Sequence, residues 1–414
     1  MDKFYIDTLG CKVNQAETDL ITDELARKGL EPVGLGQSPD WCIINTCTVT
    51  SQTDKKVRQA IRKAKKTNPG ARLLVTGCFA ELNPDFLARE GVHHVVGNKE
   101  KMNISSIVSP GGHTGVSFCE SRSRPLVKVQ DGCRQFCTYC IVPLVRGDYF
   151  SVPKEKVIGM VKNARDNGFQ EVVLTGIHLG KYGIDLKEFT LEGLLQDILN
   201  KTDIKRIRLS SIEIGEITEG LIKLMDDAGG RICSHLHIPL QSGSDEVLRS
   251  MGRPYKSKQF LDRLKKVKAG IPGIGITTDV MVGFPKESEY DFNKTLEAVM
   301  NASFSKVHVF RYSRRDKTPA AEMEGQVPDG IKKLRSSRLA KLGDSLREDY
   351  LKKNRGKVLE VVLEKRCRAA ASGTSSNFIK VSFKPKKGLK KGKIYKVFTE
   401  SMYGNGLWGK IMFN

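Results

Sequence analysis

Strand-like and helical segments alternate along most of the chain, and this alternation constrains the fold more than any other feature. Apolar runs at residues 3–6, 41–44 and 72–76 are separated by amphipathic segments at 15–28 and 53–66. An apolar run, a helix and a further apolar run make up a βαβ unit, whose strands lie parallel in one sheet. The first part of the chain is therefore predicted to be an α/β domain with a parallel sheet.

A second series of the same units begins near residue 126. Its strand candidates lie at 126–131, 171–176, 206–211, 235–240, 275–282 and 304–312. These six units fall short of the eight that close the common (β/α) barrel, so the series predicts an open, partial barrel. Residues 329–354 then predict one long basic helix that packs on this barrel.

The last sixty residues change to short β-rich runs separated by Gly and Lys turns, which predict a small β-barrel. Residues 355–414 hold fourteen Lys or Arg and three Glu, a net charge of +11, which is half of the +22 of the whole chain. Such a charge favours a polyanion as partner, most simply a nucleic acid. We predict three domains, at 1–118, 119–354 and 355–414, with the first boundary in a Gly- and Ser-rich stretch.

The sequence also bears on where the protein works. No apolar run reaches the length that spans a bilayer, and the N-terminus lacks a basic stretch followed by an apolar segment and a cleavage site. We therefore expect a cytoplasmic protein without a membrane partner. Its ten cysteines then lie in a reducing compartment, where metal binding or redox chemistry is favoured over disulfides.

Three cysteines form a compact group directly after a strand candidate. Cys133, Cys137 and Cys140, called the loop trio below, have the spacing CxxxCxxC. Three thiolates hold three irons of a cubane cluster and leave the fourth iron open to an outside ligand. Zinc is the alternative, but zinc normally takes four closed protein ligands, and the sequence around the loop offers no fourth Cys or His. The spacing favours an iron–sulfur cluster.

Three further cysteines are dispersed but share a position, since each directly follows an apolar run. Cys11, Cys47 and Cys78 are called the strand-end trio below. The carboxyl ends of neighbouring parallel strands converge on one crevice, so we expect these thiols to meet around one metal centre. An isolated cysteine is usually a small buried hydrophobe. That interpretation applies to Cys42, Cys119, Cys233 and Cys367.

Along nearly all its length the chain resembles the methylthiotransferase family of radical S-adenosylmethionine (SAM) enzymes. The resemblance rests on residues 9–14 (LGCKVN), on the loop trio and on the C-terminal barrel. It implies two [4Fe-4S] clusters, the SAM-binding one on the loop trio and an auxiliary one on the strand-end trio. It also implies that the C-terminal barrel is an RNA-binding TRAM domain. Candidate SAM-binding residues near the loop trio and the strand ends are Tyr139, Thr175, Gly176, Ser211, Glu213, Gln241 and Gly243.

The chemistry of this family replaces an aromatic C–H bond by C–S, which no side-chain acid or base achieves because the hydrogen is not acidic. The resemblance implies that an electron from the loop-trio cluster cleaves SAM to a 5′-deoxyadenosyl radical, which takes the hydrogen. Sulfur, methylated by a second SAM, would come from the auxiliary cluster. The implied partners are tRNA, an electron donor such as flavodoxin or ferredoxin, and a sulfur source.

Within the family, residues 129–133 (VQDGC) and the compact length most resemble the branch that acts on N6-threonylcarbamoyladenosine beside the tRNA anticodon. Branches acting on isopentenyladenosine or on a ribosomal-protein aspartate are alternatives, as is a non-catalytic iron–sulfur module that binds RNA. The basic barrel favours RNA, because phosphates need cations and unstacked bases need rings. Its aromatic residues, which also suit a barrel core, are Phe383, Tyr395, Phe398 and Trp408.

Substrate contacts are predicted at two places. The threonyl carboxylate needs a cation, and Arg146, just beyond the loop trio, is the candidate, with a structural salt bridge as its alternative role. Phosphate contacts are expected from the lysine loop, defined as Lys386, Lys387, Lys390 and Lys391. Two departures from the family pattern lie near substrate and cofactor: Phe150 stands where Arg is common, and Lys286 where Gly is common.

Overall fold

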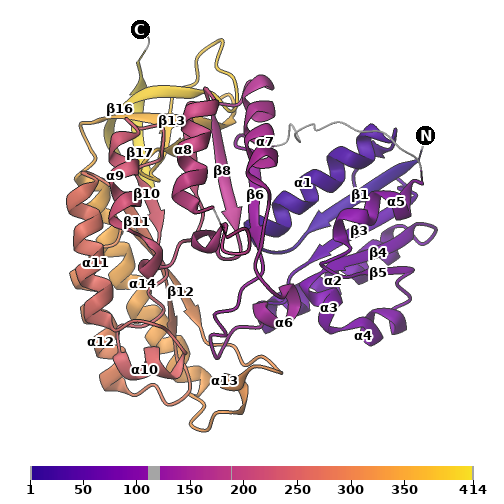
Figure 1. The fold of residues 1–414 in the computed structure, drawn as a ribbon, viewed down its shortest axis with the longest axis horizontal. Coiled ribbons are helices and arrows are strands. Elements are labelled where there is room, and N and C mark those ends of the chain that lie inside the picture. Colours follow the sequence, from indigo (N-terminus) through magenta and orange to yellow (C-terminus); the bar gives the residue numbers. More distant parts are fainter. Residues whose placement is uncertain (1, 111–121, 188, 413–414) are drawn as a thin grey trace.

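The computed structural model describes residues 2–110, 122–187 and 189–412. Figure 1 shows an N-terminal α/β domain beside a central domain, with the C-terminal β-barrel at one end of the central strands. The predicted boundary between residues 118 and 119, and Cys119, lie outside the described residues.

The N-terminal domain is a five-stranded parallel sheet with the order β2-β1-β3-β4-β5. Its strands are β1 (Lys3–Thr8), β2 (Glu31–Pro32), β3 (Trp41–Thr46), β4 (Arg72–Gly77) and β5 (His94–Val96). Its helices are α1 (Lys12–Arg27), α2 (Ser51–Thr67), α3 (Cys78–Leu82), α4 (Pro84–Arg89) and α5 (Ile104–Val108). Every residue of β3 is buried, as expected for a central strand with helices on both faces of its sheet.

The central domain contains the six predicted parallel strands in chain order. They are β6 (Leu126–Asp131), β8 (Glu171–Gly176), β9 (Arg206–Leu209), β10 (His235–His237), β11 (Gly275–Val282) and β12 (Lys306–Arg311). A single parallel bridge between Ser211 and His237 continues the sheet from β9 to β10. The partial barrel predicted from the sequence is confirmed, with one addition, because β7 (Phe150–Ser151) pairs antiparallel with β6.

Helices cover the outside of this partial barrel. They are α6 (Val142–Arg146), α7 (Lys154–Asp166), α8 (Leu191–Lys201), α9 (Glu219–Asp227), α10 (Asp245–Ser250), α11 (Ser257–Gly270), α12 (Glu289–Ala302), α13 (Pro319–Glu322) and α14 (Asp329–Lys352). The long helix α14 confirms the prediction for residues 329–354. It packs against β12, where Leu339 is fully buried.

The C-terminal part is a closed barrel with the strand order β13-β14-β15-β17-β16, which confirms the predicted small β-barrel. Its strands are β13 (Val358–Arg366), β14 (Ala371–Ser375), β15 (Lys380–Phe383), β16 (Ile394–Tyr403) and β17 (Gly406–Ile411). Phe383 is fully buried in its core, whereas 39% of Phe398 is exposed. Tyr395 and Trp408 are half-buried.

The barrel packs against the amino-terminal ends of the central strands. Arg208 of β9 donates to the carbonyl oxygens of Ser375 (2.9 Å) and Ser376 (3.1 Å). The ring of Phe378 stacks on His235 at a centroid distance of 4.2 Å and lies under the Arg208 guanidinium. This loop of the barrel lies at the amino-terminal ends of the central strands, opposite the end at which β6 leads into the loop trio.

The N-terminal domain lies across the open side of the partial barrel. On one side α1 packs along β6. On the other side Arg315, beyond β12, donates to Asp54 (2.7 Å) and to Thr48 (2.5 Å) of the N-terminal domain. The domain therefore spans the gap between the first and last strands of the partial barrel. Among the described residues, no helix combines the length and apolar character needed to cross a membrane.

Candidate active site

The loop trio lies in the segment that follows β6, and all three of its cysteines line one cavity of about 200 Å³. Gly132 starts this segment at φ +72°, and a Cβ there would lie 1.7 Å from the carbonyl oxygen of Asp148. Glycine therefore lets the loop fold back on itself, and Cys133 N donates to Gly147 O at 3.1 Å. Burial raises the pKa of Cys140 to about 12, so its thiolate form depends on a bound cation such as iron.

Four of the predicted SAM-binding residues line the same cavity. These are Tyr139, Ser211, Glu213 and Gln241. The other three have different surroundings. Thr175 is buried within β8, and Gly176 packs against the Gln130 side chain. Gly243 lies against α12, where an added Cβ would be 2.6 Å from Ala298 Cβ, so it permits helix packing rather than facing the cavity.

Two residues of the cavity were missed by the sequence analysis. Arg253 Nη1 lies 3.4 Å from Cys137 Sγ, and its other terminal nitrogen binds Glu213. His178 Nδ1 lies 3.3 Å from Cys133 Sγ, and its Nε2 lies 2.6 Å from Glu216. Burial lowers the pKa of His178, but the contacts with Cys133 and Glu216 outweigh burial and raise this pKa to about 9. His178 lies two residues beyond β8, so its position after a predicted strand could have identified it. Arg253 follows α10, and no sequence pattern pointed to it.

The strand-end trio lies at the carboxyl edge of the N-terminal sheet. Cys11, Cys47 and Cys78 follow β1, β3 and β4, which are adjacent strands. Burial raises the pKa of Cys47 to about 11, and the charges of Cys78 and Cys11 add to this effect, so the three thiols are near one another. A Cβ on Gly10 would lie 2.8 Å from Cys47 Cβ, which explains why the turn before Cys11 needs glycine.

The geometry of both trios suits a cluster of several irons. Among the described residues, no three His, Cys, Asp or Glu side chains are close enough to share a single metal ion. Thiolates on one zinc ion lie roughly 4 Å apart, given a Zn–S distance of about 2.3 Å. A cubane binds each cysteine to a different iron and therefore holds the sulfurs farther apart. The three thiols that line the loop-trio cavity are a donor set that fits a [4Fe-4S] cluster with one open iron.

The two trios are joined by a small apolar contact. Cys78 packs against Ile141 and Val145, which directly follow the loop trio. Asn98 reinforces this contact, because its Nδ2 donates to Val145 O at 2.6 Å and lies 3.8 Å from Cys78 Sγ. The segment that leaves one trio thus rests on a member of the other.

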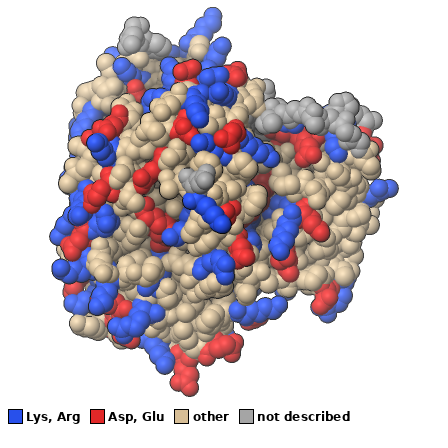
Figure 2. Space-filling model, in the orientation of Figure 1, with Lys and Arg blue, Asp and Glu red and all other residues tan. Residues whose placement is uncertain are grey.

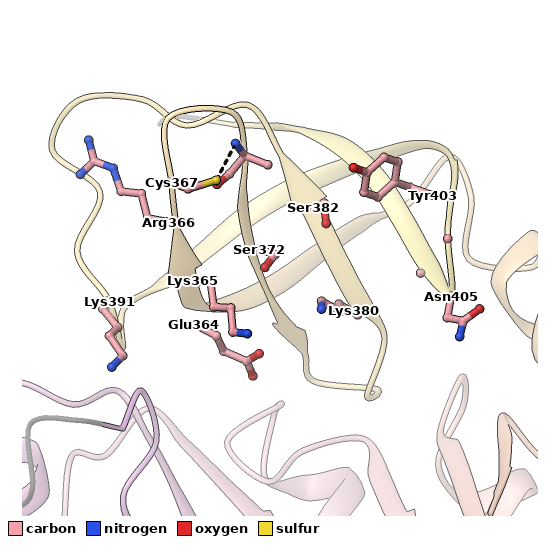
Figure 3. A pocket seen from close by; sticks show the side chains of 13 residues that line it. Glu364, Lys365, Arg366, Cys367, Ser372, Lys380, Ser382, Lys391, Tyr403 and Asn405 are labelled. Atoms are coloured by element: carbon pink, nitrogen blue, oxygen red, sulfur yellow. Dashed lines mark hydrogen bonds between the residues drawn. The ribbon is translucent and has the colours of Figure 1, made fainter. Parts of the chain in front are cut away.

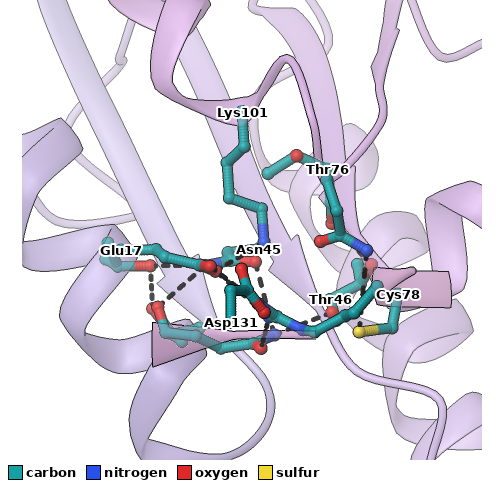
Figure 4. A network of polar contacts seen from close by, with 12 residues as sticks. Glu17, Asn45, Thr46, Thr76, Cys78, Lys101 and Asp131 are labelled. Atoms are coloured by element: carbon teal, nitrogen blue, oxygen red, sulfur yellow. Dashed lines mark hydrogen bonds and ion pairs between the residues drawn. The ribbon is translucent and has the colours of Figure 1, made fainter. Parts of the chain in front are cut away.

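Arg146 lies in a buried polar network between the N-terminal and central domains (Figure 4). Only 8% of the residue is exposed. Its guanidinium donates to Glu17 (2.8 Å), to both carboxylate oxygens of Asp131 (2.9 Å) and to Asn14 (2.6 Å). Lys101 also binds Glu17, at 2.6 Å. Arg146 is therefore committed to the network, and this geometry supports the structural salt bridge instead of the predicted substrate contact.

The network keeps its carboxylates ionised. Burial alone would raise the pKa of Glu17, but Lys101, Arg146 and Lys128 hold that pKa well below its usual range. The pKa of Asp131 is likewise lowered, because Arg146 and Lys128 outweigh its burial. Glu17 belongs to α1 and Asp131 ends β6, so the network fixes the strand that leads into the loop trio against the helix that begins beside Cys11.

The lysine loop connects β15 to β16, and its four side chains are exposed. Nearby, a groove of about 1190 Å³ runs over the barrel (Figure 3). Basic and aromatic residues in its lining include Lys365, Arg366, Lys380, Lys391 and Tyr403. On the face shown in Figure 2, basic side chains are spread over the molecule and interleaved with acidic ones, so this view shows no single basic stripe.

The remaining cysteines and the two departures have local explanations. Cys42 and Cys233 are buried as expected, but the expectation for Cys367 was wrong, because it is exposed in the barrel groove. Lys286 adopts φ +64°, a conformation that favours the family's glycine. Phe150 pairs with Asp131 in the β6/β7 ladder, and 59% of it is exposed beside the segment that carries the loop trio.

Two family models match the chain. The Radical SAM superfamily matches residues 127–299, and Uncharacterized protein family UPF0004 matches residues 3–97. Membership of the Radical SAM superfamily implies one [4Fe-4S] cluster and SAM.

Curated relatives extend over nearly the whole chain. The threonylcarbamoyladenosine tRNA methylthiotransferase of Bacillus subtilis is 40% identical over 94% of this chain and 92% of its own length. The tRNA-2-methylthio-N6-dimethylallyladenosine synthase of Anoxybacillus flavithermus is 33% identical over 87% and 73%. Among solved structures, the radical SAM methyltransferase TsrM of Kitasatospora setae shares the fold, with a TM-score of 0.58, 14% identity and coverage of 78% and 75%. The chain therefore belongs to the tRNA methylthiotransferase family of radical SAM enzymes.

Proposed function

We propose that the protein converts N6-threonylcarbamoyladenosine, next to the tRNA anticodon, into its 2-methylthio derivative. Five relatives named for this substrate are 36–40% identical to the chain, whereas three named for dimethylallyladenosine are 31–33% identical. The observation that carries the proposal is the contact of Cys78 with Ile141 and Val145. Hydrogen removal and sulfur delivery act on the same adenine carbon, so their two centres must lie on either side of one substrate.

Each part of the site has a role in this proposal. The loop trio would hold the SAM-binding cluster, and the strand-end trio the auxiliary [4Fe-4S] cluster. When bound, the first cluster and SAM supply the one-electron chemistry that removes hydrogen from an unactivated carbon. Arg253 and His178 place hydrogen-bonding nitrogens beside the sulfurs of Cys137 and Cys133.

The cavity residues beside the loop trio, Tyr139, Ser211, Glu213 and Gln241, are proposed to bind SAM. The lysine loop and the neighbouring groove would contact tRNA phosphates. The reaction also requires an electron donor, such as flavodoxin or ferredoxin, and a sulfur source. A cytoplasmic location, where tRNA is used, is part of the proposal.

Anaerobically reconstituted enzyme tests this proposal with tRNA that carries either threonylcarbamoyladenosine or isopentenyladenosine. Mass spectrometry of digested nucleosides should detect methylthiolation of the first tRNA and little of the second. Equal or better activity on the isopentenyl tRNA would reassign the substrate, and modification of a ribosomal-protein aspartate instead would point to the third branch. A protein that forms no 5′-deoxyadenosine with SAM and reductant would be a non-catalytic RNA-binding module.

A further inference from the structure

Lys12 of the N-terminal domain lines a cavity beside the central strands. It follows Cys11 and begins α1, but its charge acts on groups of the central strands. These groups are Arg208 on β9, Asp279 on β11 and His308 on β12. Lys12 therefore lies within electrostatic range of three strands of the central domain.

The cavity has a volume of about 500 Å³ and lies where all three domains meet. The N-terminal domain contributes Lys12, and the central domain contributes Arg124 and Arg208. The C-terminal barrel contributes Lys365 and Phe378. Phe378 belongs to the barrel loop that packs on the amino-terminal ends of the central strands, so the cavity, called the recess below, is lined by this loop as well as by Lys12.

The charges around the recess are unbalanced. Arg206 and Arg208 pair with the buried carboxylate of Glu171, and Arg124 pairs with Glu171 and, at 2.6 Å, with Glu364, which also lines the recess. Asp279 faces Lys12 but lies 3.3 Å from His237 Nε2. Lys12 itself makes no ion pair and no side-chain hydrogen bond with any residue that the structure describes. Six Lys or Arg side chains line the recess, whereas Glu364 is the one carboxylate among its described lining residues, so the recess attracts an anion even though Lys12 is exposed.

We propose that Lys12 binds the carboxylate of the threonyl group and thereby selects threonylcarbamoyladenosine over isopentenyladenosine. This inference rests on the proposed function and adds the residue that determines specificity. Lys12 directly follows Cys11 in the chain, so the residue that carries the cation is a neighbour in sequence of one cysteine of the strand-end trio. In adenine, C2 and C6 flank the same ring nitrogen, so a substituent on N6 starts close to the carbon that receives sulfur.

An isopentenyl group would leave Lys12 unpaired in this recess, which gives the enzyme a physical reason to reject that substrate. A tRNA backbone phosphate is the other anion that Lys12 could meet. The two sources differ in one respect: a phosphate is present in every tRNA, whereas the carboxylate is present only on the modified base. A substrate series that changes the base alone separates them.

The experiment compares Lys12→Gln with wild-type holoenzyme and with Lys63→Gln, which makes the same change on an exposed face of α2. Three tRNAs are used: one with threonylcarbamoyladenosine, one with its methyl ester, and one with isopentenyladenosine. Both kcat/KM and the Kd for tRNA are measured. Iron content and 5′-deoxyadenosine formation without tRNA report that the variants are folded and loaded.

Lys12→Gln should lower kcat/KM for the carboxylate substrate roughly 10- to 100-fold, the range of a charge-assisted hydrogen bond. For the wild-type enzyme, kcat/KM should fall by a similar factor when the methyl ester replaces the carboxylate substrate. Combining Lys12→Gln with the ester should lower kcat/KM no further than either change alone. Lys12→Arg should recover most of the activity, and Lys63→Gln should behave like the wild type. In Lys12→Gln, the ratio of kcat/KM for the threonylcarbamoyladenosine tRNA to kcat/KM for the isopentenyladenosine tRNA should be smaller than in the wild type.

Two results would overturn the inference. One is Lys12→Gln with full activity on the carboxylate substrate, and the other is an equal weakening of all three tRNAs, which indicates a phosphate contact. Wild-type enzyme that leaves the carboxylate substrate unmodified refutes the proposed function itself, so the two failures are distinguishable.

Discussion

Replacing Arg146 by Met should destabilise the contact between the N-terminal and central domains. The substitution keeps a long apolar stem but removes the guanidinium that joins Glu17, Asp131 and Asn14. Side chains of Arg146 and Glu17 are 1% and 2% exposed, so water cannot replace the lost partner. Removing one partner of a buried ion pair costs about 3–5 kcal/mol.

The lower end of this range is expected, about 3 kcal/mol, because Glu17 keeps Lys101 and Lys128 as partners. With a slope of roughly 1–3 kcal/mol per molar urea, the unfolding midpoint should fall by about 1–3 M. The chain has two tryptophans, Trp41 in the N-terminal domain and Trp408 in the barrel. In a Trp408→Phe background, fluorescence therefore reports on the N-terminal domain alone.

The matched control is Arg165→Met, which breaks a partly exposed pair with Asp166 and should cost less than about 1 kcal/mol. Adding Glu17→Gln to Arg146→Met should not recover the loss, since it leaves the buried ammonium group of Lys101 without its carboxylate. The reasoning is refuted if Arg146→Met shifts the midpoint no more than Arg165→Met does.

Three further predictions concern the clusters, the barrel and pH. Alanine substitution of either complete trio should remove about half of the iron, leaving roughly four irons per chain. Only the loop-trio variant should lose 5′-deoxyadenosine formation, and only the strand-end variant should cleave SAM without sulfur insertion; iron content unchanged by both would contradict the assignment. Charge reversal of the lysine loop should weaken tRNA binding and flatten its dependence on salt, and an unaltered slope would show that the loop faces away from RNA. Burial raises the pKa of Glu171, but Arg208, Arg206 and Arg124 bring it down from 4.5 to about 2, so its stabilisation is complete above pH 4.5 and is lost as pH falls toward 2. Trp408 fluorescence should show a smaller acid transition in Glu171→Gln than in the wild type, and identical transitions would count against this role.

The features that were predictable from the sequence are those that depend on short, local residue patterns. The period of apolar residues locates β6 and β8, and cysteines directly after strands locate both trios, because parallel strands deliver their carboxyl ends to one edge. Two-residue strands such as β2 and β7 gave no such signal, since pairing with a longer neighbour defines them. β10 ends at His237, earlier than predicted, and Pro239 just beyond it has no N–H to continue a ladder.

The charged partners were not predictable, because they depend on contacts between distant segments. Arg146 binds Glu17, which is 129 residues away, and nothing in the local sequence distinguishes an arginine that meets a buried carboxylate from one that meets substrate. Arg253 reaches Cys137 across 116 residues in the same way. Gly243 illustrates the opposite error, since a strand-end glycine suggested cofactor binding where the fold uses it for close packing against α12.

The C-terminal barrel packs on the amino-terminal ends of the central strands. If the barrel binds tRNA as proposed, this position sets the distance between that RNA contact and the candidate active site. The eight residues of β11 span about 26 Å, so roughly that length would separate the basic barrel from the loop trio at the opposite ends of the central strands. An RNA long enough to reach both gains the effective concentration of a tethered second site, whereas a shorter hairpin engages only one. Selection of the anticodon region would then depend on the distance between the basic barrel and the candidate active site as well as on the modified base.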